Sequence, residues 1–166
     1  DLALEVMDFV GGETIPPDVV EERRLIRAKA LAEQEKYLES LQTLEGDESK
    51  AANTIRLDVL FKMQNWFGVM RMVEARLQEI KEAPQHMKER DANELTMLAI
   101  AYSHQQERAK LLALRKDFLG SIPLRDKRLL LSYLTSDPGD VDYRSLDYTV
   151  QIEDISEFLT RNIFWP

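Results

Sequence analysis

The chain has 166 residues, of which 44% are hydrophobic, and it carries a formal net charge of −8 at pH 7. That acidity excludes nucleic acid as an expected partner, because phosphate binding needs a basic face. The absence of cysteine excludes disulfide bonds, thiol catalysis and thiolate metal sites. The sequence contains no apolar run of about 18 residues, the length that would span a bilayer, so it predicts no membrane insertion.

Residues 1–10 are predicted to form a helix, because Ala3, Met7 and Val10 recur at helical spacing and two glycines follow as a stop. The sequence begins on Asp1, inside this apolar pattern, and shows no signal-peptide pattern. We therefore expect the chain to be a fragment of a longer protein, with any targeting signal upstream.

Two matched helix pairs are expected next, over residues 24–47 and 53–76. Pro17 favours a helix start, since proline suits the first helical turn. The second helix of each pair starts on an aromatic residue, Tyr37 or Trp66, and these lie 29 residues apart. A helical pattern repeated at such a period is typical of a stacked solenoid. The expected helices cover residues 18–34, 37–45, 52–63 and 66–80.

A third helix pair is expected over residues 91–120, after Pro84 breaks the helical pattern. Asp91 and Glu94 have the spacing of a capping box, which predicts a helix start at Asp91. Gly120 ends the second helix of this pair. Strand-like alternation is nearly absent. Beyond the pair, the sequence predicts a short helix over residues 129–134, a turn-rich acidic loop over 135–140 and a last amphipathic helix around 152–159.

These segments resemble tetratricopeptide repeats, which are helix-turn-helix units with small and large residues at fixed positions. The resemblance covers residues 20–120 and also extends to the C-terminal part of long bacterial repeat proteins attached to the cell envelope. That likeness implies the periplasm or envelope ahead of the cytoplasm. The matching residues are Ala28, Leu31 and Tyr37 in the first unit, Leu60 and Trp66 in the second, and the spacing of Ile100 to Ala109 in the third.

The chain also departs from the family pattern. Leu57 and Ile100 replace the small residue of the first helix, and the closing prolines are missing. The alanine of the second helix is replaced by Ser40, Val69 and Leu112.

The resemblance implies a concave groove lined by the first helix of each pair, where a partner protein or peptide binds. Phe61 is the expected anchor, because aromatic side chains make good interface contacts, and its burial by a neighbouring helix is the alternative. The family's clamp for acidic chain ends needs lysines and asparagines that these positions lack. The implied groove residues are Leu25, Lys29, Ala32 and Glu33, then Thr54, Asp58, Phe61 and Lys62, and then Met97, Ala101, His104 and Gln105.

Signatures of catalysis and of cofactors are weak. The two histidines, His86 and His104, do not form a zinc-protease spacing, and no glycine-rich phosphate loop occurs. Ser103 and His104 are adjacent on a predicted helix, so their side chains point about 100° apart and form no catalytic pair. The acidic residues of the 137–147 region invite a calcium interpretation, but Arg144 stands where such a loop needs an oxygen ligand. A solvated loop is the preferred interpretation, and we expect no cofactor.

Charge is unevenly distributed along the chain. The basic stretch Arg23, Arg24, Arg27 and Lys29 is interpreted as an exposed helix face with intrahelical ion pairs. Residues 137–166 carry seven acidic and two basic residues, a net charge of −5. This end either docks on a basic partner surface or caps the helical stack with a polar face. The closing aromatic residues pack under the last helix or meet another surface.

The sequence thus predicts an all-α domain over residues 1–166, built as a right-handed solenoid of antiparallel helix pairs over 18–120. Capping helices and the acidic loop follow over 121–166. The predicted function is a protein-interaction scaffold, with self-association as one form of partner binding. An accessory domain of a larger enzyme is the alternative, and an enzyme in its own right is the weakest interpretation.

Overall fold

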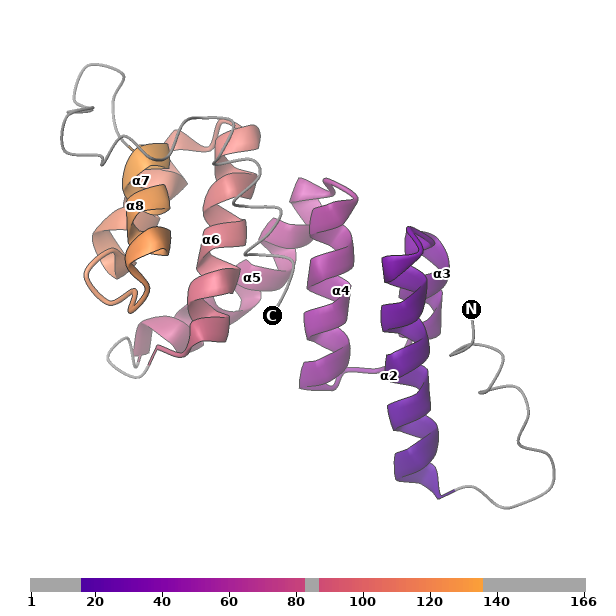
Figure 1. Cartoon of the computed structure of the whole chain (residues 1–166). Coiled ribbons are helices and arrows are strands. Elements are labelled where there is room, and N and C mark those ends of the chain that lie inside the picture. The colour runs from indigo at the N-terminus through magenta and orange to yellow at the C-terminus, as the bar shows by residue number, and fades with distance from the viewer. Residues whose placement is uncertain (1–15, 83–86, 136–166) are drawn as a thin grey trace. The chain divides into compact units, whose positions relative to one another are not determined.

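The computed structural model describes residues 16–82 and 87–135 of the chain, and this part is built from α-helices with no β-strand (Figure 1). The all-α prediction is confirmed for these residues. The chain divides into two compact units, residues 1–65 and 66–166. Several sequence predictions lie outside the described residues: the helix over 1–10, His86, the loop after Thr135, the helix around 152–159 and the closing aromatic residues.

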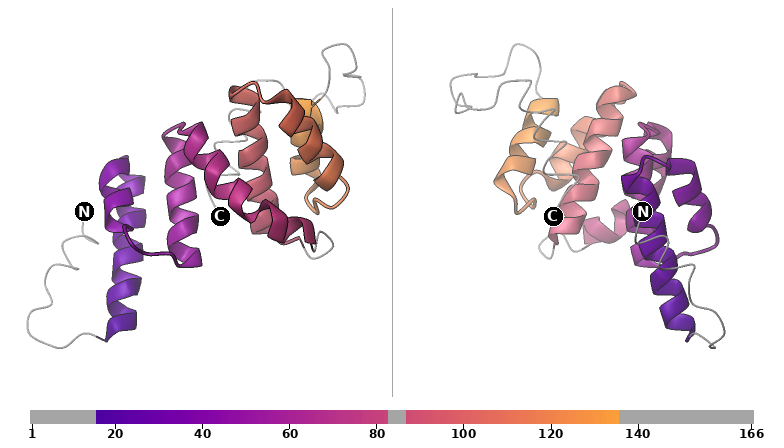
Figure 2. Two further views of the ribbon diagram at one scale, coloured as in Figure 1. Left: turned by 180° about the vertical axis from the view of Figure 1, so that it is seen from behind. Right: turned by 45° about the vertical axis from the view of Figure 1, so that its right-hand side comes forward.

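The first unit contains helices α2 (Pro17–Glu33), α3 (Tyr37–Thr43) and α4 (Lys50–Lys62). α2 packs against both α3 and α4, and α3 packs against α4 (Figures 1 and 2). Ala28, Leu44 and Ala52, one from each of three successive segments, form a fully buried cluster at the centre. Leu25 and Ile55 pack against that cluster. The first predicted helix pair is therefore present as α2 and α3.

The start of α4 is fixed by side-chain capping. The Ser49 hydroxyl accepts a hydrogen bond of 3.2 Å from the backbone N–H of Ala52, which satisfies a donor that the helix itself leaves unpaired. Arg56 then ties the helix to the preceding loop, because its guanidinium donates to the carbonyl oxygens of Leu44 and Asp47, each at 3.0 Å. These contacts hold the α3–α4 connection in one geometry.

Three helix ends share the same left-handed turn. Glu35, Gln64 and Gln106 have φ angles of 60°, 55° and 57°. In each case the following backbone N–H bonds back to a carbonyl five residues earlier, at 2.9 Å, as in a Schellman helix end. The next helices begin at Tyr37, Trp66 and Arg108. The same backbone turn thus precedes each of these three helices.

The second unit contains α5 (Trp66–Glu82), α6 (Glu89–His104), α7 (Arg108–Phe118) and α8 (Arg125–Thr135). α6 packs against α5, α7 and α8, and α7 also packs against α8 (Figure 1). Because neighbours surround α6, every residue from Glu94 to Tyr102 is buried. The third predicted pair is present as α6 and α7. The second pair spans the boundary between the units, and its pairing stays a prediction.

The start predicted for α6 was wrong. Asp91 does not begin the helix but lies in its first turn, where its carboxylate accepts the backbone N–H of Lys88 at 3.0 Å. This is the reciprocal half of a capping box; the lysine side chain, which has no acceptor, cannot supply the other half. The helix therefore begins two residues earlier than expected, at Glu89.

The predicted register of the third pair was wrong by one residue. Counted from the left-handed residue of the turn, the position that holds Ala28 in the first pair holds Ala99 in the third, and the position of Ser40 holds Leu111. Leu111 is only 3% exposed, whereas Leu112, the residue expected there, is 43% exposed. The reason is that α7 begins at Arg108, one residue before the Ala109 used in the prediction.

The helix predicted over residues 129–134 is longer than expected. α8 begins at Arg125 and ends at Thr135. Two arginines of α7 bind its C-terminal end: Arg108 donates to the Thr135 carbonyl at 2.9 Å, and Arg115 donates to the Thr135 hydroxyl at 3.0 Å. Cations at this end are favourable because the last carbonyls carry partial negative charge. Within the described residues, no helix has the length and apolar character needed to cross a membrane.

Candidate functional site

A pocket of about 560 Å³ lies between α2 and α3 in the first unit. This volume falls within the range of roughly 300–1,000 Å³ that is typical of ligand sites. α2 supplies most of the wall, and one face of the shorter α3 supplies the rest. The lining residues are Val20, Arg23, Arg24, Arg27 and Leu31 from α2, and Glu39, Gln42 and Thr43 from α3.

Helical spacing brings the α2 residues of the pocket together. Val20, Arg24, Arg27 and Leu31 follow one another at four, three and four residues, which places them on one stripe of the helix. Leu31 is buried and forms an apolar part of the wall, whereas Val20 is 49% exposed. The stripe therefore combines guanidinium groups with apolar surface at both of its ends.

Positive charge dominates the lining of this pocket. Arg23, Arg24 and Arg27 line the pocket together with one acidic residue, Glu39. Thr43 adds little chemistry of its own, because its hydroxyl donates to the backbone carbonyl of Glu39 at 2.8 Å. The arrangement is suited to binding carboxylates, since guanidinium groups pair with them through two parallel hydrogen bonds.

Arg24 is held in place by an acidic partner from the loop after α3. Its guanidinium lies 2.7 Å from the carboxylate of Asp47. Hydrogen bonds from the backbone N–H and the side chain of Ser49, followed by the contact with Arg24, lower the pKa of Asp47 from 3.8 to about 2. The Nε atom of Arg24 is buried and has no hydrogen-bond acceptor among the described residues. One charged member of the pocket is thus already ordered.

The basic stretch predicted to be an exposed face has a different role. Arg23 and Arg24 are half-buried, and Arg24 pairs with Asp47 outside its own helix. Arg27 and Lys29 are exposed, as expected. The prediction failed for the first two arginines because α3 folds back against α2 and covers one side of this stripe.

The groove positions implied on α2 lie on the other face of that helix. At about 100° per residue, Leu25, Lys29 and Glu33 point nearly opposite to the stripe from Val20 to Leu31. Lys29 and Glu33 are exposed, while Leu25 packs against the central cluster and Ala32 is buried. The pocket and the implied groove are therefore different surfaces.

The remaining implied groove residues differ in exposure. Thr54, Asp58, Lys62 and Gln105 are half-buried. Phe61 is only 7% exposed. The structure therefore supports the alternative that Phe61 is buried, and it is not an exposed anchor. Met97 and Ala101 are also buried, at 3% and 0% exposure, and offer no surface to a partner. A groove that runs through both units stays a prediction.

His104 is exposed, and its ring stacks on Trp66 with centroids 4.4 Å apart and an interplanar angle of 6°. The stack joins the start of α5 to the end of α6. Its neighbour Ser103 is exposed as well. This geometry gives the imidazole a packing role in the second unit.

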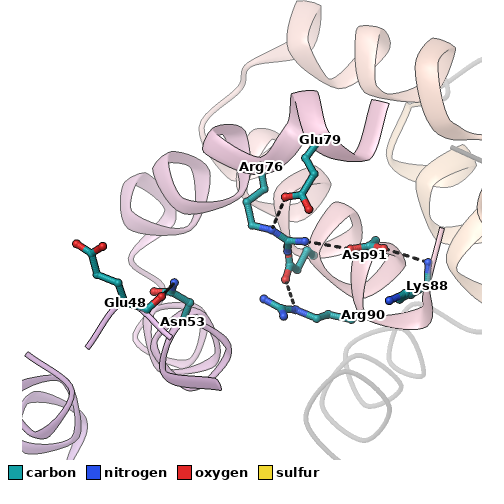
Figure 3. A network of polar contacts seen from close by, with 8 residues as sticks. Glu48, Asn53, Arg76, Glu79, Lys88, Arg90 and Asp91 are labelled. Atoms are coloured by element: carbon teal, nitrogen blue, oxygen red, sulfur yellow. Dashed lines mark hydrogen bonds and ion pairs between the residues drawn. The ribbon is translucent and has the colours of Figure 1, made fainter. Parts of the chain in front are cut away.

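Polar groups in the second unit connect helices to one another. Arg76 on α5 bonds to Glu94 and lies 3.2 Å from Asp91, both on α6, and Arg90 bonds to Glu94 at 2.8 Å (Figure 3). Glu94 is only 5% exposed, so its charge needs these partners. Among the described residues, no cluster of three or more His, Asp or Glu side chains could hold a metal ion.

A second polar cluster centres on Glu74. Its carboxylate accepts hydrogen bonds from the Tyr102 hydroxyl at 2.8 Å and from the Lys110 ammonium at 3.0 Å. Lys110 also lies over the Tyr102 ring, 5.5 Å from its centroid. Burial raises the pKa of Glu74, but the hydrogen bonds from Lys110 and Tyr102 outweigh it, so the pKa is lowered on balance. These charges are mutually satisfied, and the cluster links α5, α6 and α7.

No protein-family model matches the chain, and searches of curated proteins and of solved structures find no significant match. The class that the fold of the described residues defines is all-helical.

Proposed function

We propose that this chain is a non-catalytic protein-interaction scaffold whose α2–α3 pocket binds an acidic, partly apolar segment of a partner protein. The observation that carries the proposal is the stripe of Arg23, Arg24 and Arg27 beside Val20 and Leu31 around an open pocket. Polar groups flanked by apolar surface are typical of sites that bind peptides rather than single ions.

The pocket residues have different roles in the proposed binding. Arg23 and Arg27 offer guanidinium groups to partner carboxylates, while their aliphatic stems extend the apolar wall of Leu31. Arg24, held by Asp47, needs little further ordering, and ordering costs oppose binding. Gln42 and Glu39 on α3 give the opposite wall a polar rim that fixes the orientation of a bound segment.

The proposal includes the arrangement of residues 18–120 as a right-handed stack of tetratricopeptide-like helix pairs. Two features support it: the three identical left-handed turns, and the close approach of α2 and α3 at Ala28 and Ser40. Scaffolds of this kind present extended surfaces built from successive repeats. Binding at the pocket adds a second surface to the groove that the resemblance implies.

A binding titration tests this function. The probe is a synthetic helical peptide of unrelated sequence with glutamates at positions i, i+1 and i+4 beside leucines, and its control is the same peptide with glutamines. We expect the double variant Arg23→Glu, Arg27→Glu to bind the acidic probe about 10- to 100-fold more weakly than the wild type, because opposite charges become like charges.

The matched control carries Arg71→Glu and Lys116→Glu, two exposed changes outside the pocket with the same total change in charge. It should leave the affinity within about twofold of the wild type, since changes of surface charge far from a contact have small effects. If both variants weakened binding of the acidic probe equally, the loss of affinity would come from the overall charge of the protein and not from the pocket. If the folded Arg23→Glu, Arg27→Glu variant bound the acidic probe as tightly as the wild type, the pocket would not be the binding site.

A further inference from the structure

The three arginines of the pocket have a counterpart in this same chain. Arg23, Arg24 and Arg27 are spaced at i, i+1 and i+4. Three acidic residues near the other end of the chain, Glu153, Asp154 and Glu157, have the identical spacing. We propose that the partner segment is the acidic stretch 151–159 of a second copy of the chain, an inference that rests on the proposed function of the pocket.

The stretch 151–159 matches the pocket in chemistry as well as in spacing. It contains no lysine or arginine, so nothing in it opposes the guanidinium groups. Between and beside the acids it carries four apolar residues, which suit a pocket that has apolar surface at both ends of its arginine stripe. These residues are Ile152, Ile155, Phe158 and Leu159.

A contact of this kind joins two different surfaces of identical chains. Such a heterologous interface leaves one free pocket and one free segment on every assembled pair, so it continues head to tail until a ring closes or an open chain forms. The chain carries a net charge of −8, which opposes unspecific self-association. Attraction therefore has to come from the local basic pocket, and it should weaken as salt screens the charges.

Full-length variants test the inference. The pocket variant carries Arg23→Glu and Arg27→Glu, and the segment variant carries Glu153→Gln, Asp154→Asn and Glu157→Gln. Sedimentation equilibrium is measured over increasing protein concentration at low salt. We expect the mass of the wild type to rise with concentration and each variant alone to stay monomeric.

The decisive sample is an equimolar mixture of the two variants. Each pair then contains one intact pocket and one intact segment, so the mixture should form heterodimers and stop at that size, because neither end of the pair can continue. A wild-type chain that stays monomeric at all concentrations overturns the inference. This outcome would also arise if the segment occupied the pocket of its own chain, and in that case too the second-copy partner is wrong. A mixture that stays monomeric overturns it as well.

Failure of this inference can be told apart from failure of the proposed function. The segment variant retains the pocket, so the unrelated acidic peptide should bind to it with wild-type or higher affinity. If that peptide binds but the mixed variants do not associate, the second-copy partner is wrong and the pocket function stands. If neither occurs, both proposals fall. The exposed variant Arg71→Glu, Lys116→Glu, which carries the same change in charge as the pocket variant, should self-associate like the wild type, and loss of association there would point to net charge alone.

Discussion

The hydroxyl of Ser40 donates a hydrogen bond of 2.7 Å to the backbone carbonyl oxygen of Ala28, and neither residue is exposed to solvent. The bond joins α3 to α2 through two small, fully buried residues. Both positions are fully buried, so a larger side chain at either one would have to displace packed neighbours. The pocket depends on this contact because the same two helices form its walls.

Ser40→Ala should lower the free energy of unfolding by about 1 kcal/mol, the usual net value of a buried hydrogen bond. Ser40→Leu should cost about 1–3 kcal/mol through overpacking against Ala28. Urea denaturation measures both. The control is Ser103→Ala, an exposed serine whose loss should stay within about 0.5 kcal/mol. Equal effects at Ser40 and Ser103 would contradict the close approach.

Neighbouring leucines test the register of the third helix pair. Leu111 is 3% exposed, whereas Leu112 is 43% exposed. Leu111→Ala should therefore lower the free energy of unfolding by about 2–5 kcal/mol, because it removes buried surface and leaves a cavity. Leu112→Ala should change it by about 0.5 kcal/mol or less. If Leu112→Ala were the more destabilising of the two, the register predicted from the sequence, with Leu112 buried, would be correct.

Most of the described helices could be predicted from sequence, because apolar spacing reports directly which face of a helix is buried. α5, with Val69, Met70 and Val73 buried along its predicted stripe, is the clearest case. The register of α7 could not be predicted in the same way. Its leucines are consecutive, so the pattern alone does not say whether Leu111 or Leu112 points inward. The left-handed turn at Gln106 decides it, and glutamine gives little sequence signal for that conformation.

The pocket was missed for a related reason. The arginines of α2 were visible in the sequence, but a basic stripe on a helix usually faces water. Val20 and Leu31 at the ends of the stripe were the available signal, since they lie at helical spacing from Arg24 and Arg27. The second wall comes from α3, and its position depends on the turn at Glu35, which only the three-dimensional structure supplies.

The buried carboxylate of Glu94 makes its arginine partners important for stability. Arg76→Ala should lower the free energy of unfolding by about 1–3 kcal/mol; this is less than for a fully buried pair, because the arginine is 29% exposed. Glu79→Gln is the control: its carboxylate is 71% exposed, lies 3.7 Å from the same arginine, and should contribute almost nothing (Figure 3). Thermal or urea denaturation of both variants checks the difference. Equal losses of unfolding free energy in the two variants would contradict the greater importance of the buried Arg76–Glu94 contact over the exposed Arg76–Glu79 contact.

Acid should weaken the first unit through Asp47. Its pKa is lowered from 3.8 to about 2 in the folded chain, so the folded state favours the ionised carboxylate. The resulting stabilisation is present above the unfolded pKa and is lost as the pH falls from about 4 to about 2. The melting temperature of Asp47→Asn should lie below that of the wild type at pH 6, and the two values should converge near pH 2. A constant difference across this range would contradict the assigned ionisation.

Backbone amide NMR during titration with the unrelated acidic peptide tests the central claim most directly, because it reports which face of α2 the peptide contacts. We predict chemical-shift changes clustered at Val20, Arg23, Leu31, Gln42 and Thr43, around the pocket. Residues on the opposite face of α2, Lys29 and Glu33, should change little. Changes centred on Lys29 and Glu33, or absent from α3, would contradict the assignment of the pocket as the binding site.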